Sequence, residues 1–121
     1  MWASTSRELF EEAARAMFSL ITDLQKVRPT EERRVRVEGE SREERLVGWL
    51  SELLFLHEME GLLFCQFEVK EGERGVKGMA RGEFFDPHRH PVERVIKAVT
   101  YHQLEVKRAD GLWSVQIIFD I

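Results

Sequence analysis

The sequence predicts an α+β domain in which two amphipathic helices pack against a largely antiparallel β-sheet. The chain has 121 residues, which is enough for one domain. Apolar residues recur with helical spacing in two segments of its first half, and most of its second half reads as strands. Helices and strands segregated in this way are typical of the α+β class. No repeat or Pro/Gly linker divides the chain, so we expect a single domain over residues 1–121.

The first helix is predicted to begin after Thr5 and to end near Asp23–Val27. Thr5 and Glu8 have the spacing of a capping box, in which a hydroxyl and a carboxylate satisfy free backbone N–H groups. The helix should end before Pro29, since proline disfavours helical backbone at the residue that precedes it. Its apolar stripe consists of Leu9, Ala13, Met17, Leu20 and Leu24.

A half-exposed strand and a second helix are expected next. Valines alternate with arginines in Glu32–Glu38, which is the pattern of a strand with one buried face. Ser41 and Glu44 repeat the capping-box spacing, and Gly61 is a typical residue for a helix C-terminus. The apolar stripe of this helix consists of Leu46, Trp49, Leu50, Leu53, Leu56 and Met59.

The remainder of the chain predicts four strands. Leu62–Lys70 is the first, and Val76–Phe84 is a weaker one because Gly78 and Gly82 interrupt it. The first of these strands should present one apolar face made of Leu63, Cys65, Phe67 and Val69. The last two strands are expected at Val95–Val106 and Leu112–Asp120, joined by a hairpin turn at Ala109-Asp110-Gly111.

Charge and composition exclude several classes of function. The chain carries 18 Lys and Arg against 22 Asp and Glu, so its net charge is −4. A mildly acidic protein is a poor candidate for binding a nucleic-acid backbone unaided. No apolar run approaches the length of a membrane span, and no secretory signal is visible, so we expect no membrane contact. Cys65 is the single cysteine, which excludes an internal disulfide and a cysteine zinc cluster, so we expect a protein of the reducing cytoplasm.

Two groups of residues are candidates for binding chemistry. Asp86, His88 and His90 would supply a carboxylate and two imidazoles to a metal ion, although the same residues are ordinary in a turn. Lys97 lies in an otherwise apolar run. It is either a functional cation that meets an anion or an edge-strand lysine that blocks aggregation.

The C-terminus is a third candidate. Asp120 and the terminal carboxylate of Ile121 place two hard oxygen donors within one residue of each other. Such a pair forms half of a site for a calcium-like ion, provided that the tail is held in place. The alternative is a frayed chain end.

The sequence resembles the archease family over essentially its whole length. The most specific stretches are Lys97-Ala98-Val99-Thr100-Tyr101-His102 and the terminal Ile117-Ile118-Phe119-Asp120-Ile121. The other matching stretches are Glu8 to Ala14, Leu20 to Asp23, Leu50 to Leu56, Gly82-Glu83, Asp86 to His90, and Trp113.

This resemblance implies an accessory role in RNA ligation. Archease is a non-catalytic partner of the RtcB-type tRNA-splicing ligase, which works through a histidine–guanylate intermediate made from GTP. The resemblance implies that this chain promotes ligase guanylylation and multiple turnover in tRNA splicing and RNA repair. It would meet RNA only indirectly, through the ligase. Its acidic balance suits a basic RNA-binding partner.

The resemblance also implies a divalent metal site, with calcium as the expected ion. In the family, a C-terminal aspartate and the last residue bind the ion together with an aspartate of a first strand. Asp120 and Ile121 match the first two positions, whereas the printed sequence starts at Met1-Trp2-Ala3 and has no counterpart of the third. We therefore expect an archease-like domain that is truncated at its N-terminus and has an incomplete ligand set. Lys97 is a further candidate for ligase activation, with Asp86 and His90 after it.

Two other functions stay open at the level of sequence. A small metal-dependent hydrolase would use Asp86, His88 and His90, and would hold a transition metal tightly. A chaperone-like interaction module would act on several unrelated clients without catalysis. The activator, by contrast, should be selective for one ligase.

Overall fold

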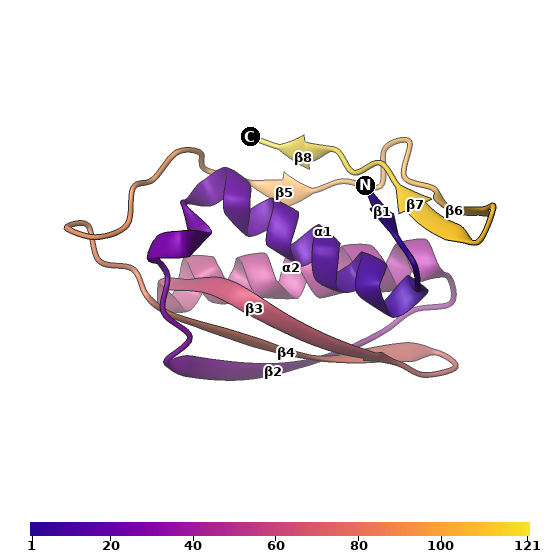
Figure 1. Ribbon diagram of the computed structural model, residues 1–121, viewed down its shortest axis with the longest axis horizontal. Coiled ribbons are helices and arrows are strands. Elements are labelled where there is room, and N and C mark those ends of the chain that lie inside the picture. Colours follow the sequence, from indigo (N-terminus) through magenta and orange to yellow (C-terminus); the bar gives the residue numbers. More distant parts are fainter.

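Three layers make up the computed structural model, which describes residues 1–121 (Figure 1). One outer layer is a three-stranded antiparallel sheet with the spatial order β2 (Glu31–Glu38), β4 (Gly75–Phe84) and β3 (Leu62–Glu71). Helices α1 (Ser6–Ile21) and α2 (Arg42–Glu60) form the middle layer and cover one face of this sheet. The other outer layer contains short strands: β1 (Trp2–Ala3), β5 (Ala98–Val99), β6 (Val106–Ala109), β7 (Leu112–Val115) and β8 (Phe119–Asp120). The predicted α+β class is confirmed.

Both helices begin at the predicted caps. The Thr5 hydroxyl accepts a hydrogen bond from the Glu8 N–H at 3.1 Å, and the Ser41 hydroxyl accepts one from the Glu44 N–H at 3.1 Å. Helix α2 ends at Gly61, whose φ of +72° is the left-handed conformation that glycine adopts without strain. Neither helix has the length and apolar composition that crossing a membrane requires.

Helix α1 is shorter than predicted. It ends at Ile21, and a 3₁₀ turn, η1 (Leu24–Lys26), follows it. The side chain of Asp23 accepts a hydrogen bond from the Gln25 N–H at 3.1 Å and so caps this new turn. The helical spacing of apolar residues continues to Leu24 because this residue, in the turn after the helix, still packs against the core.

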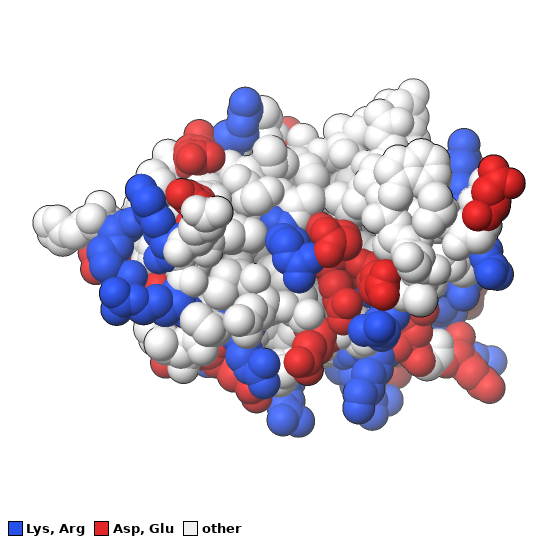
Figure 2. Space-filling model, in the orientation of Figure 1, with Lys and Arg blue, Asp and Glu red and all other residues white.

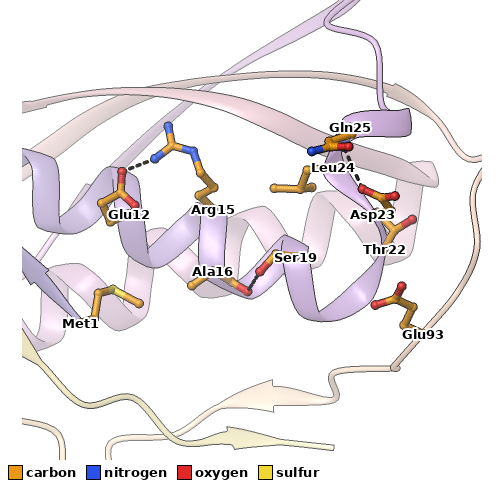
Figure 3. A pocket seen from close by; sticks show the side chains of 10 residues that line it. All are labelled: Met1, Glu12, Arg15, Ala16, Ser19, Thr22, Asp23, Leu24, Gln25 and Glu93. Carbon is orange, nitrogen blue, oxygen red and sulfur yellow. Dashed lines mark hydrogen bonds and ion pairs between the residues drawn. The ribbon is translucent and has the colours of Figure 1, made fainter.

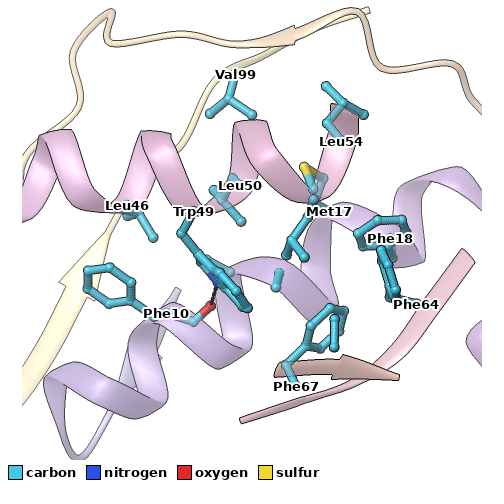
Figure 4. Close-up of a cluster of buried hydrophobic side chains, with 14 of the residues drawn as sticks. Phe10, Met17, Phe18, Leu46, Trp49, Leu50, Leu54, Phe64, Phe67 and Val99 are labelled. Atoms are coloured by element: carbon cyan, nitrogen blue, oxygen red, sulfur yellow. Dashed lines mark hydrogen bonds between the residues drawn. The ribbon is translucent and has the colours of Figure 1, made fainter. Parts of the chain in front are cut away.

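Trp49 of α2 joins the two helices to the sheet. Its side chain is fully buried, and its indole N–H donates a hydrogen bond to the carbonyl oxygen of Phe10 in α1 at 3.1 Å (Figure 4). Its ring meets Phe67 of β3 edge to face, with ring centroids 6.4 Å apart. Figure 4 also shows Val99 of β5 above α2, so the second strand layer packs on the same core.

The glycines of β4 mark close packing rather than weakness. Val76–Phe84 was expected to be the weaker strand, yet β4 is the central strand of its sheet and pairs along its length with both neighbours. A Cβ at Gly78 would lie 2.2 Å from the Trp49 ring, and a Cβ at Gly82 would lie 1.7 Å from the carbonyl oxygen of Leu63. Only glycine fits at either position.

The predicted apolar face of β3 is wrong at Cys65. The register of β3 against β4 shifts between Phe64 and Gln66, which makes Cys65 the extra residue of a β-bulge. As a result Leu62, Leu63 and Phe64 are all buried in succession, whereas Cys65 is half-buried. The inserted residue reverses which side chains of the strand point towards the core. A prediction based on strict alternation of buried and exposed residues does not include such an insertion.

The last third of the chain contains less strand than predicted. Of Val95–Val106, only β5 and the first residue of β6 are strand, and Leu112–Asp120 divides into β7 and β8. Ile96 and Val99 are both buried although they are three residues apart, a spacing that a regular strand does not allow. The hairpin turn is confirmed, with φ values of +55° and +76° at Asp110 and Gly111.

Gly78→Ala should destabilise the protein, because the new methyl group would displace Trp49. We expect the free energy of unfolding to fall by about 1–3 kcal/mol, the usual cost of overpacking a core. Chemical denaturation followed by tryptophan fluorescence measures this difference. Gly72→Ala is the control, since a Cβ there meets only the Gly75 carbonyl oxygen at 3.5 Å. Equal stabilities for the two variants would contradict the packing described above.

Candidate functional site

A buried polar cluster lies where β4 runs into the loop that leads to β5. Glu83, at the end of β4, is 8% exposed, and His90 is 2% exposed. The Glu83 carboxylate accepts hydrogen bonds from the Arg28 N–H at 2.5 Å and from the His90 Nε2 at 3.2 Å. The guanidinium of Arg89 pairs with the other carboxylate oxygen. Glu83 therefore connects the end of β4 both to the loop that follows it and to the segment before β2, which is distant in the sequence.

The hydrogen bonds of His90 determine which ring nitrogen carries its proton. The Nδ1 atom accepts a hydrogen bond from the Asp86 N–H at 2.9 Å, so this nitrogen is unprotonated. The proton then lies on Nε2, from which it is donated to Glu83. Both nitrogens of this buried ring are thus occupied within the protein, and His90 has no lone pair left for a metal ion.

The environment of Glu83 keeps it ionised. Burial by itself raises the pKa of Glu83, but hydrogen bonds from the Arg28 N–H, Arg89 and His90, with the charge of Arg89, lower this pKa to about 2. The same carboxylate adds to the effect of burial in raising the pKa of the nearby Cys65 thiol. A protonated thiol is a poor nucleophile, so a raised pKa does not favour nucleophilic chemistry at Cys65.

The residues of the expected histidine metal site have other partners. The backbone N–H of His88 donates to the Asp86 carboxylate at 2.9 Å, and this bond is the main cause of a lowered Asp86 pKa. His90 turns away from this carboxylate towards Glu83. No group of three or more His, Cys, Asp or Glu side chains is arranged to hold a metal ion. The loop is therefore built by turn chemistry, which was the alternative interpretation of the sequence.

Lys97 and the C-terminal tail lie side by side. β5 and β8 pair antiparallel, with Ala98 opposite Asp120, and the Lys97 N–H donates to the Asp120 carbonyl oxygen at 2.6 Å. The Thr100 N–H donates to the Ile118 carbonyl oxygen at 3.2 Å. The tail is thus held by backbone hydrogen bonds, unlike the frayed end that was the alternative.

The side chains at this pair of strands are free for a partner. Lys97, Asp120 and Ile121 are all exposed, and the side chains of Lys97 and Asp120 take part in no ion pair. Lys97 is not buried, so its ammonium group needs no internal anion. The two carboxylates of the tail are donors of the type that calcium prefers, but two such groups do not complete a ligand set of six or more oxygens. The residues present thus offer the type of ligand oxygen that a divalent cation prefers, but too few of these oxygens to complete its coordination.

A polar hollow lies beside the C-terminal end of α1, with a volume of about 550 Å³ (Figure 3). Thr22, Asp23 and Glu93 line it. The hydroxyl of Thr22 is buried and has no hydrogen-bond partner. The Glu93 N–H donates to the Ile21 carbonyl oxygen at 2.8 Å and so fastens the β4–β5 loop to α1.

The structure therefore divides the sequence-predicted residues into two groups. Lys97, Asp120 and Ile121 form one exposed group at β5 and β8, whereas Asp86 and His90 belong to the loop cluster around Glu83. The organising role of Glu83 was missed by sequence reasoning. A carboxylate just before a loop rich in Arg and His was the available signal.

Glu83→Gln should destabilise the protein in a pH-dependent way. A glutamate titrates near 4.5 when unperturbed and Glu83 near 2, so its contribution is present above pH 4.5 and is lost as the pH falls towards 2. We expect the variant to lose about 2 kcal/mol at neutral pH, because hydrogen bonds to a buried charge are lost. Its unfolding free energy should then change less than that of the parent between pH 5 and pH 2.

Unfolding free energies of the parent and the variant, measured from pH 7 to pH 2, give both the loss of stability at neutral pH and its dependence on pH. Glu68→Gln is the matched control, since that side chain is 70% exposed and its ion pair with Arg81 is 3.9 Å long. If Glu83→Gln and Glu68→Gln have the same pH profile, Glu83 does not anchor the loop.

The chain is similar to known proteins over its full length. The model of the Archease protein family (MTH1598/TM1083) matches residues 1–121. The chain is 49% identical to the protein archease of Methanopyrus kandleri, over 100% of this chain and 89% of that protein. It is 40% identical to the protein archease of Pyrococcus furiosus, over 99% of this chain and 88% of that protein.

Solved structures agree with this match. Protein 1598 of Methanobacterium thermoautotrophicum, known from a solution structure, superposes with a TM-score of 0.87 at 40% identity and covers 99% of this chain and 88% of its own. The crystal structure of a Thermotoga maritima archease, described as a possible chaperone, superposes with a TM-score of 0.67 at 21% identity, over 100% of this chain and 87% of its own, and so supports the fold alone. From the match of the family model and of these relatives, we conclude that the chain belongs to the archease family.

Proposed function

We propose that this protein is a non-catalytic accessory protein that activates an RtcB-type tRNA-splicing RNA ligase by promoting its guanylylation and turnover. The observation that carries the proposal is the pairing of β5 with β8, the two segments in which the resemblance to archease is most specific. An exposed cation and two exposed carboxylates lie on this pair.

The side-chain chemistry of this surface suits docking better than catalysis. Lys97 offers one unpaired ammonium group, and Asp120 and Ile121 offer two carboxylates on a tail that backbone hydrogen bonds hold in position. Groups fixed in this way bind a partner without a large cost in chain entropy. The net charge of −4 favours encounter with a basic RNA-binding enzyme.

Asp86 and His90 have a positioning role in this proposal. His90 is buried and bonded at both ring nitrogens, so it does not contact the ligase. With Glu83 it fixes the start of the loop that leads to Lys97. Loss of this cluster would act on activation indirectly, by releasing the loop.

We propose that a divalent cation, with calcium as the expected ion, binds at the tail. Asp120 and Ile121 would be its ligands from this chain, and the remaining oxygens would come from water or from the ligase. The ion would neutralise the two carboxylates at the docking surface. Complete coordination would then depend on the complex.

Asp120→Asn should reduce stimulation of ligase guanylylation, because it removes one of the two carboxylates of the tail without changing the size of the side chain. We expect a loss of about tenfold or more in the stimulated rate, equivalent to ~1.4 kcal/mol. The assay measures the transfer of labelled GMP from GTP to a cognate ligase, with and without this protein.

Asp110→Asn is the matched control. It removes one carboxylate from the exposed hairpin turn, where asparagine also tolerates a positive φ. Equal stimulation by the two variants would show that the tail is not the activating surface. No stimulation by the parent protein would remove the activator role and favour a chaperone-like module, which should protect several unrelated clients from aggregation.

A further inference from the structure

Three cations lie in one row across the outer face of the sheet. Arg36 of β2 is the register partner of Lys77 of β4, and Lys77 is the partner of Lys70 of β3. All three residues are exposed. Side chains of directly opposed residues stand on the same face with Cβ atoms about 5 Å apart, and like charges in this arrangement destabilise a sheet. The stability of the sheet therefore does not explain why three cations stand in this row.

Only one cation of the row, Arg36, has a carboxylate partner on this face, which is Glu38. Glu32 and Glu68 lie around Arg81, at 3.2 and 3.9 Å from its guanidinium, further along the strands. Lys70 and Lys77 have no carboxylate within ion-pair distance. Two of the three cations of the row, Lys70 and Lys77, are thus unpaired, and Arg36 has only its partner Glu38.

The face is open, and it is hollowed on both sides of the row. Hollows of about 500 and 390 Å³ are both lined by Arg36, Lys70 and Lys77. Arg36 and its carboxylate partner, Glu38, are 3.8 Å apart with side chains 70% and 74% exposed, so this pair is weak. The helices cover the opposite face of the sheet (Figure 1), and Figure 2 shows Lys and Arg side chains, with Asp and Glu side chains among them, along the lower edge of the molecule.

We propose that the row of Arg36, Lys77 and Lys70 binds the phosphate backbone of single-stranded RNA. This inference rests on the proposed function, because the ligase is what brings RNA to the protein. The row lies in the layer opposite to β5 and β8, so it meets RNA that extends beyond the reacting ends. No aromatic residue stands on this face to stack on a base, so the contact is with phosphates and is independent of sequence.

The overall charge of the protein makes this a weak, auxiliary contact. A net charge of −4 opposes the approach of a polyanion, and three phosphate contacts supply little affinity by themselves. When the ligase holds the same RNA, the contact becomes intramolecular, and its effective concentration is high. The row would then lower the apparent KM for RNA without affecting guanylylation, which uses no RNA.

Fluorescence anisotropy with a short fluorescein-labelled oligouridine tests the row directly, at low salt and without ligase. Binding by the parent protein should weaken with salt at a logarithmic slope of about −2, since each of three contacts to a single strand contributes about −0.7. In a variant carrying Arg36→Gln, Lys70→Gln and Lys77→Gln, affinity should fall by about tenfold or more and the slope should approach zero. The melting temperature of this variant should be equal to or higher than that of the parent, because the like-charge row is gone.

A second triple variant is the matched control. Lys26→Gln, Arg94→Gln and Lys107→Gln removes the same charge from exposed positions outside this face. Equal losses in the two variants, or parent binding with no salt dependence, would overturn the proposal. Tighter binding of labelled polyglutamate than of RNA would identify an acidic protein as the occupant instead. Stimulation of ligase guanylylation, measured for the parent protein and both triple variants, separates the two proposals. If the parent fails to stimulate guanylylation, the activator role fails. The anisotropy result still decides whether the row binds RNA.

Discussion

The indole of Trp49 is the contact on which both helices and the sheet depend. Its N–H bonds to a carbonyl oxygen of α1, its backbone belongs to α2, and its ring fills the space that Gly78 leaves on β4. One side chain thus sets the spacing of two layers. The same packing accounts for glycine at position 78 of β4, and the close approach of the Leu63 carbonyl oxygen accounts for Gly82.

A second anchor connects this framework to the surface. Glu83 receives hydrogen bonds from the segment before β2 and from the β4–β5 loop, while Glu93 fastens the same loop to the end of α1. A carboxylate that stays ionised at neutral pH in a buried position holds these segments firmly. The loop then delivers Lys97 next to the tail. The buried polar groups give the site its geometry, and the exposed ones are left to meet a partner.

The distribution of charge follows the layers. Short strands on one side present Lys97 and the carboxylates of the tail, and the sheet on the other side presents a positive row. A protein that is acidic as a whole can therefore offer two surfaces of different character. One surface suits a basic enzyme, and the other suits the backbone of a nucleic acid. The helices between them bury most of their apolar stripes in the core, although Leu20 and Met59 are exposed.

The sequence by itself determined the features that depend on neighbours along the chain: the hydroxyl caps at Thr5 and Ser41, the end of α2 at Gly61, the hairpin at Asp110-Gly111 and the α+β class. The resemblance to archease also pointed to Lys97 and Asp120. Only the tertiary structure decided the bulge at Cys65, the length of the last strands, the bonding of His90 to Glu83 and the row across three strands. Each of these depends on strand register or on contacts between distant segments. Local spacing carries no information about which residues will stand opposite one another once the layers have packed.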